Sequence, residues 1–293
     1  MNVSEPISAA RQRRSFLSPG AYVPLIPPVS ALLLFFALPM GMMIGLSFET
    51  TLGGFGLSNY QDFFTDDLAL DGLRRTLVMS GLVAISVTVM AYPIAYFLAR
   101  STTRWRVIVF ALAIAPELAG VVLRTYGWLV ILEKNGFIND TLISLGLIEE
   151  PLPLIGNMFG AVVGLTHVLL PFGILSLLTS IQGIDQNLEK SAQILGASRL
   201  SVLRHIVFPL SLPGIMSSFL IAFTLSASAY ATPALLGGIK FKVLATMIYR
   251  EVLVLVNWPA AAVMATVLLV IVIGIAFFST RAENRIVNRL HVR

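Results

Sequence analysis

The feature that most constrains this chain is a series of apolar runs, each close to the length of a membrane-crossing helix. A helix needs about 20 predominantly apolar residues to span the hydrocarbon core of a bilayer. Six stretches approach that length, at about residues 23–46, 76–98, 107–129, 158–180, 210–235 and 260–278. Because backbone polar groups must be satisfied within lipid, the chain is predicted to be an all-α, polytopic membrane protein with six transmembrane helices.

The composition supports this class and excludes several others. Hydrophobic residues make up 57% of the chain and charged residues only 12%, which is atypical of a soluble domain. The absence of cysteine excludes disulfides and thiolate metal sites, and His167, His205 and His291 lack the spacing of metal ligands. No Gly-x-x-x-x-Gly-Lys-Ser/Thr phosphate loop is present. We therefore expect no catalytic, metal or cofactor site in this chain, and expect any ATP to be hydrolysed by another chain.

The distribution of charge orients the six spans. Both termini, the turn at 100–106 and the polar stretch at 182–209 lie on one side of the membrane if the spans alternate. Most of the 20 Lys and Arg residues fall on that side, whereas the connections at 49–75 and 134–157 are acidic. The positive-inside rule therefore places both termini in the cytoplasm, with the chain in the cell inner (plasma) membrane. The basic balance follows from this topology and requires no nucleic acid.

The longest polar interruption in the second half, residues 187–215, has the local signals of two short helices. Asp185 is expected to cap the first helix, because its carboxylate can accept from the free amides of the first turn. Three apolar residues fall on one face of that helix at a four-then-three spacing: Leu188, Ala192 and Leu195. Gly196 supplies a left-handed stop, and Ser198 can cap the second helix. The first helix is too polar to cross a bilayer.

This helix–turn–helix between two apolar spans resembles the signature loop of ABC importer permeases. That pattern is Glu-Ala-Ala, three residues, Gly, nine residues, Ile, one residue, Leu-Pro. Here the register gives Lys190-Ser191-Ala192, then Gly196, Ile206 and Phe208-Pro209, so the spacing matches while Lys, Ser and Phe replace Glu, Ala and Leu. The resemblance implies that the loop is a coupling helix that docks into a cleft on a cytoplasmic ATPase. The implied coupling residues are Leu188, Glu189, Lys190, Ser191, Ala192, Leu195, Gly196, Ala197, Ile206 and Pro209.

Two further stretches resemble the spermidine/putrescine-type permeases. They are residues 123–128, Leu-Arg-Thr-Tyr-Gly-Trp, and residues 228–238, Ser-Ala-Tyr-Ala-Thr-Pro-Ala-Leu-Leu-Gly-Gly. The adjoining Pro116-Glu117 departs from the apolar residue expected there. The resemblance covers the chain from Arg75 to the sixth span and implies a MetI-like, type I ABC transmembrane domain. The implied segments are a cytoplasmic tail at 1–20, a first transmembrane helix at 21–47, the transmembrane domain at 75–279 with its coupling loop at 182–209, and a cytoplasmic tail at 280–293.

The same resemblance implies the partners of the chain. They are a second permease subunit, in a homodimer or heterodimer, two cytoplasmic ATPase subunits that bind ATP and Mg²⁺, and a periplasmic or extracellular solute-binding protein. In such an importer the ATPases close on ATP, the coupling loops move with them, and the pore alternates between inward and outward access. The implied solute is a polyamine or a similar small molecule, although related permeases carry other amines, opines, phosphonates or metal complexes.

Charged side chains inside a span are costly and point to function. Glu117 and Arg124 lie seven residues apart in the third span and are expected on one helix face. One interpretation is that Arg124 snorkels to the outer interface and Glu117 neutralises it. The other is that both residues line the substrate path, with Tyr126 close by.

The fifth span is rich in hydroxyl groups. Ser217, Thr224 and Ser228 share a face at i, i+7 and i+11, and Tyr230 follows. Such residues mediate close helix packing in many membrane proteins. The alternative is a polar strip along the substrate path, where Tyr230 and other aromatic residues can stack on a cation.

Two other classes of protein were compared with an ABC permease. A secondary, ion-coupled transporter is expected to show an inverted repeat of interrupted spans and ionisable residues at the midplane, and no repeat is visible in the sequence. An intramembrane enzyme needs a catalytic constellation, and His167 in the fourth span has no identifiable partner in the sequence. Uptake that depends on ATP distinguishes the ABC permease from both.

Overall fold

The computed structural model describes residue 24, residues 26–50 and residues 54–291, with side chains as far as Arg281. The predicted N-terminal tail, 1–20, lies outside these residues. Throughout the described part the regular structure is helical, and the β-type pairing found there is a single bridge between Glu49 and Phe55. The predicted all-α class is confirmed.

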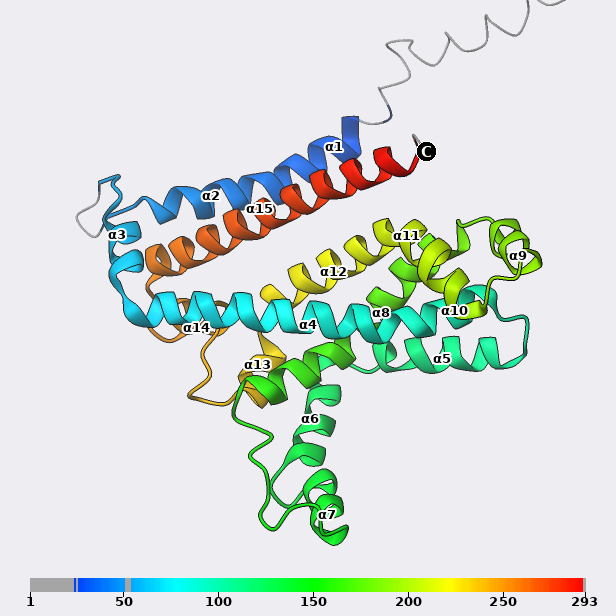
Figure 1. Cartoon of the computed structure of the whole chain (residues 1–293). Coiled ribbons are helices and arrows are strands. Elements are labelled where there is room, and N and C mark those ends of the chain that lie inside the picture. Colours follow the sequence, from blue (N-terminus) through cyan, green and yellow to red (C-terminus); the bar gives the residue numbers. More distant parts are fainter. Residues whose placement is uncertain (1–23, 25, 51–53, 292–293) are drawn as a thin grey trace, which may run out of the picture.

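Three long helices form the centre of the molecule. They are α4 (Asp67–Arg100), α8 (Met158–Gln182) and α12 (Leu212–Ala227), which run side by side in Figure 1. Small residues bring them close together: a Cβ added to Gly173 of α8 would lie 2.5 Å from a Val87 methyl and 3.0 Å from the Ser218 hydroxyl. Close approach through small residues is the usual basis of helix association in membranes, where burial of apolar surface provides little drive.

A second layer lies beside this centre. The first span consists of α1 (Ile26–Leu32), a π-helical segment η3 (Leu33–Ala37) and α2 (Leu38–Ser47), and it packs along α15 (Trp258–His291), as Figure 1 shows. Its apolar side chains are largely exposed, including Phe35 and Phe36, as expected of a helix that faces lipid. The short helix α3 (Ser58–Thr65) then leads into α4, which Asp66 caps by accepting from the Leu68 amide at 2.9 Å.

The third span is not one helix, contrary to the prediction for residues 107–129. It is divided into α5 (Trp105–Leu118) and α6 (Val121–Leu132), and α5 is bent by 102° from the stretch Val121–Ser144, which begins with α6. Ala119 and Gly120 are extended there, and the preceding Pro116 lacks the amide that would close its helical turn. As a result α6 and the following α7 (Phe137–Ser144) project away from the helical bundle in Figure 1.

The fifth span is also interrupted, so the prediction of a continuous span at 210–235 is wrong at its end. Helix α12 ends at Ala227, and a separate short helix, α13, covers Ala231–Leu236. The hydroxyl of Ser228 bonds back to the carbonyls of Thr224 and Leu225, each at 3.2 Å. Such local side-chain bonds compete with continuation of the helix. Beyond α13, charged and apolar residues are interspersed in 240–259, and this segment contains the amphipathic helix α14 (Leu244–Leu253).

The number of membrane spans agrees with the predicted topology once the bent helices are taken into account. Four helices of the described part are long and apolar enough to cross a bilayer, and the number rises to six when each of two bent pairs counts as one span. One pair is the divided third span, and the other is Arg199–Leu210 with Leu212–Ala227, bent by 65°. The last helix, α15, extends past the predicted end at residue 278.

Candidate functional site

The polar stretch between the fourth and fifth spans folds as two short helices joined by a tight turn. Helix α9 (Gln186–Ile194) is capped by Asp185, whose carboxylate accepts from the Asn187 amide at 2.9 Å. Helix α10 (Arg199–Val202) is capped by Ser198, whose hydroxyl accepts from the Ser201 amide at 3.3 Å. Both predicted caps are confirmed. Two further turns, η4 (Leu203–Val207) and α11 (Phe208–Leu210), connect α10 to α12.

The turn between the two helices depends on glycine. Gly196 has φ of +90°, a conformation that side chains resist, so the predicted left-handed stop is confirmed. The Gly196 amide donates to the Gln193 carbonyl and the Ala197 amide to the Ala192 carbonyl, each at 3.0 Å. This pair of bonds is a Schellman motif, which satisfies carbonyls that the end of α9 leaves free.

One side of this helix–turn–helix packs on the ends of α4 and α8. Its inner residues contact a cluster that contains Leu98 of α4 and Ile181 of α8, both fully buried. Three of the predicted coupling residues pack on this cluster and are half-buried, namely Ala192, Ala197 and Ile206, and Pro209 in α11 is half-buried as well. They hold the two helices in place and are not free to contact another protein over most of their surface.

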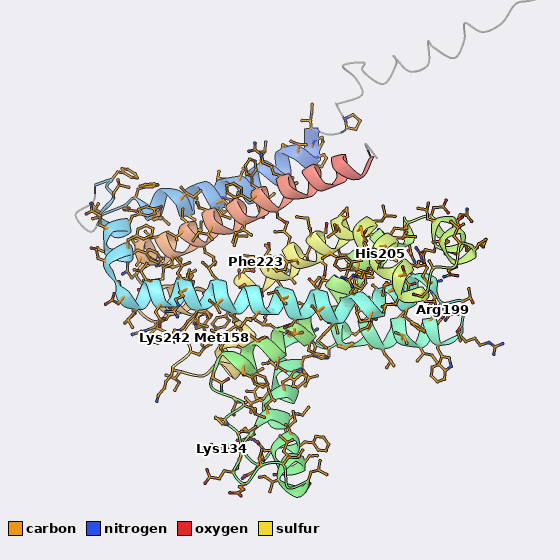
Figure 2. The ribbon with its side chains drawn as sticks, in the orientation of Figure 1. Lys134, Met158, Arg199, His205, Phe223 and Lys242 are labelled. Atoms are coloured by element: carbon orange, nitrogen blue, oxygen red, sulfur yellow. The ribbon has the colours of Figure 1, made fainter. Side chains whose placement is uncertain are left out.

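An outer apolar patch is made of Leu188, Ile194, Leu195 and Leu200, of which Leu200 also lines a hollow with Arg100 and Glu189. All four side chains are exposed, and Leu195 retains 87% of its accessible surface. The apolar face predicted from Leu188, Ala192 and Leu195 is therefore divided, because Leu195 lies past the last residue of α9 and turns outward while Ala192 turns inward. Lys190, Ser191 and Gly196 are exposed beside the patch. Figure 2 shows Arg199 and His205 at the same end of the molecule.

Glu189 differs from its neighbours on α9 because its carboxylate faces inward. One oxygen accepts from Arg100 of α4, with Nε and Nη2 both at 2.7 Å. The Tyr96 hydroxyl lies 3.5 Å from the other oxygen. The side chains of Arg100 and Glu189 keep only 13% and 10% of their accessible surface. Glu189 is one of the predicted coupling residues, whereas no contact with this loop was predicted for Arg100 or Tyr96.

The bend between α5 and α6 is bridged by an ion pair. Arg124 Nη1 lies 2.7 Å from Glu117 Oε2, and the two residues meet across the break between α5 and α6. The prediction that they share one face of a continuous helix is wrong. Arg124 is 8% exposed, whereas Glu117 keeps 36%, so Arg124 does not extend to the surface of this chain. Within the described residues Arg124 Nε has no hydrogen-bond partner, and nor does Nδ1 of His167, whose ring contacts Trp128 edge-on at 5.7 Å.

Three of the predicted path residues share one cavity. Thr224, Ser228 and Tyr230 line a largely apolar hollow of about 680 Å³ between α12, α14 and α15. The Tyr230 ring stacks on Tyr249 of α14 with 4.3 Å between ring centres. Ser217 is half-buried on α12 outside this lining, and Tyr126 is exposed on α6, apart from it. Tyr249 had not been singled out, because only its place on an amphipathic segment was visible in the sequence.

The described part of the chain contains no group of three or more His, Cys, Asp or Glu residues arranged to hold a metal ion.

Known proteins resemble this chain over most of its length. A profile of the family described as "Binding-protein-dependent transport system inner membrane component" matches residues 8–288. The chain is 30% identical over 271 residues to the spermidine/putrescine transport system permease protein PotB of Escherichia coli (strain K12), covering 90% of this chain and 98% of that protein. A probable molybdenum ABC transporter permease protein of Haloferax volcanii is 25% identical over 205 residues, which is 70% of each chain.

Solved structures show the same fold. A chain of a bacterial ABC transporter involved in the import of the acidic polysaccharide alginate superposes with a TM-score of 0.73 at 20% identity, over 94% of this chain and 98% of that one. A chain of the MetNI methionine ABC transporter in an inward-facing conformation gives a TM-score of 0.59 at 18% identity, over 74% of this chain and 95% of that one.

Proposed function

Because this chain belongs to the binding-protein-dependent transport system inner membrane components, and is thus an integral inner-membrane permease subunit of an ABC importer, we propose that it forms one side of a translocation path that partner ATPases open and close. The observation that carries this proposal is the outer apolar patch. Four exposed apolar side chains lie on α9, on α10 and at the turn between them, and other residues of this segment pack on α4 and α8. A surface of this kind is suited to contact with a protein partner.

The partner at this patch is proposed to be a cytoplasmic ATPase subunit that binds ATP and Mg²⁺. Lys190, Arg199 and Arg204 are exposed around the patch, so the facing surface is expected to contain acidic residues. Lys190 occupies the position at which the signature loop of ABC importer permeases has Glu. We infer that the ATPase of this system is matched to a basic loop. The full assembly is proposed to contain two such ATPases, a second permease subunit and a solute-binding protein on the opposite side of the membrane.

The orientation in the membrane follows from charge. The end of the molecule that contains α9 and α10 also contains Arg100 and the basic turn that follows α4. We propose that this end and both termini are cytoplasmic, since positively charged loops remain on that side. The acidic connections at residues 49–75 and 134–157, which contain α3 and α7, then face the solute-binding protein.

The proposed solute is a polyamine or a related small cation. The 30% identity to PotB over nearly all of both chains supports this class. The stacked Tyr230 and Tyr249 at the edge of the hollow, with Thr224 and Ser228 beside them, offer aromatic faces and hydroxyl groups to such a cation. Tyr126 and Ser217 are proposed to face the path only in the assembled complex, because neither lines this hollow.

The decisive experiment combines docking and transport. The complex is purified through a tag on this chain, and radiolabelled spermidine uptake is measured in proteoliposomes with and without ATP. Leu195→Asp places a charge in the patch and removes apolar contact, which we expect to weaken ATPase association by about 3 kcal/mol, or about 100-fold. Co-purification of the ATPase and ATP-driven uptake should both be lost.

The matched control is Leu147→Asp. Leu147 is similarly exposed but follows α7, outside the α9–α10 segment, so the ATPase should still co-purify with this variant. Normal ATPase recovery with Leu195→Asp would exclude the patch as the docking surface. Uptake by the unmodified protein without ATP would favour an ion-coupled transporter instead.

A further inference from the structure

The contact between Glu189 and Arg100 joins two segments that lie 89 residues apart in the chain. Helix α9 also lies against α10 and η4, Ala192 packs on the cluster that contains Leu98 and Ile181, and the end of the helix is fixed by the turn at Gly196. Among the described residues, the hydrogen bonds that run directly from α4 to α9 all end on the Glu189 carboxylate. A further bond from Arg100 Nη2 reaches the Ile184 carbonyl, just before α9, at 3.2 Å.

This arrangement binds the start of α9 from two directions. Arg100 spans the carboxylate on one side and the backbone of the preceding loop on the other, so a movement of α9 pulls on the last turn of α4. Both side chains are almost fully buried, which shields the pair from solvent and strengthens the attraction. The planar guanidinium also fixes direction, because its donors diverge at set angles.

We propose that Arg100 and Glu189 form a latch that makes α9 and α4 move as one body when the ATPase draws on the loop. This inference rests on the proposed function, in which α9 is the docked element. Arg100 is thus a positioning residue that transmits force, and Glu189 serves this internal contact and not the docking surface. The outer apolar patch receives the motion, and the ion pair passes it to α4, which contacts both α8 and α12 in the centre of the molecule.

The latch is tested by the distance between α4 and α9. The chain has no cysteine, so nitroxide labels introduced at Val89 and Asn187, both exposed, are unique within this subunit. Pulsed electron paramagnetic resonance is recorded on the permease in nanodiscs, and on the full complex without nucleotide and after trapping with ATP and vanadate. The latch predicts one narrow distance distribution in all three samples.

Removing the charge should release α9. Loss of charge-assisted hydrogen bonds in Glu189→Gln is expected to raise the fraction of detached α9 by about 10- to 100-fold, seen as a broad distance distribution. ATP-driven uptake of spermidine should fall with it. Exchanging the charges, with Arg100→Glu and Glu189→Arg together, should narrow the distribution again. Gln193→Ala is the control, because Gln193 lines a separate hollow of about 650 Å³ together with Arg100 and Glu189 but carries no charge.

Two results would overturn the latch: a shift of the native distance between nucleotide states, or a distribution in Glu189→Gln as narrow as in the native protein. Failure of the proposed function gives a different pattern. In that case the unmodified complex shows no ATP-driven uptake, while the distance measurements on the permease alone still report whether Arg100 holds α9.

Discussion

The ion pair at the bend between α5 and α6 allows a quantitative prediction. Arg124 is 92% removed from solvent, because only 8% of its side chain is exposed, and Glu117 is its charged partner at 2.7 Å. Removing one member of a buried pair leaves an uncompensated charge and costs about 3–5 kcal/mol. Glu117 keeps 36% of its surface, so we take the lower value, about 3 kcal/mol, for Glu117→Gln. That is more than a 100-fold change in the folding equilibrium.

Three variants separate a structural role from a substrate contact. If the pair fixes the bend, Glu117→Gln lowers the yield of assembled complex and its unfolding temperature. Glu117→Gln together with Arg124→Gln then recovers both, because no charge is left buried without a partner. If Glu117 contacts the solute, the single change leaves assembly intact and lowers uptake, and the double change restores nothing.

The burial of Arg124 leads us to expect the structural outcome. Size-exclusion chromatography, thermal unfolding in detergent and ATP-driven spermidine uptake together decide between the two. Normal assembly of Glu117→Gln would refute the reasoning, since it would mean that Arg124 is solvated or paired elsewhere in the complex. The single change Arg124→Gln is the internal control, because it removes the buried charge and should cost less than Glu117→Gln.

Two further predictions concern the turn and the topology. Gly196→Val places a β-branched residue at φ of +90°, so we expect a strain of about 2 kcal/mol or more and loss of ATP-driven uptake while the permease still reaches the membrane; normal uptake would mean that the Schellman turn is dispensable. For topology, cysteines introduced at Asp66 and Glu149 should react with an impermeant thiol reagent in intact cells, whereas one at Asn284 should not. Labelling at Asn284 from outside would contradict the six-span orientation.

The fold class and the helical caps were predictable because their causes are local. Apolar length identifies spans, and Asp185, Gly196 and Ser198 act on backbone groups within three residues of themselves. The bends were not predictable in the same way. Hydropathy remains high through Leu118 to Gly120, and it does not register the extended backbone that divides the third span.

The contacts that shape the candidate site were harder to predict because they are distant in sequence. Arg100 reads as an ordinary member of a basic turn until the fold brings it to Glu189, and Tyr249 reads as part of an amphipathic segment until it stacks on Tyr230. Even the predicted pairing of Glu117 with Arg124 held for a different reason from the one expected. The two residues meet because the helix bends between them, and not because they share one helical face.

The two interrupted spans come together in the structure, which bears on where a solute can pass. Helix α6, beyond the first break, packs on α13, beyond the second, and the hydroxyls of Thr125 and Thr232 lie 3.1 Å apart between them. Thr125 also donates to the Val121 carbonyl, one turn earlier on α6, at 2.7 Å. Irregular backbone at membrane depth is tolerated where protein satisfies it or where it lines a water-filled cavity. Ser228 and Tyr230, in the break between α12 and α13, line the hollow. We therefore propose that the path runs from this hollow to the α6–α13 contact.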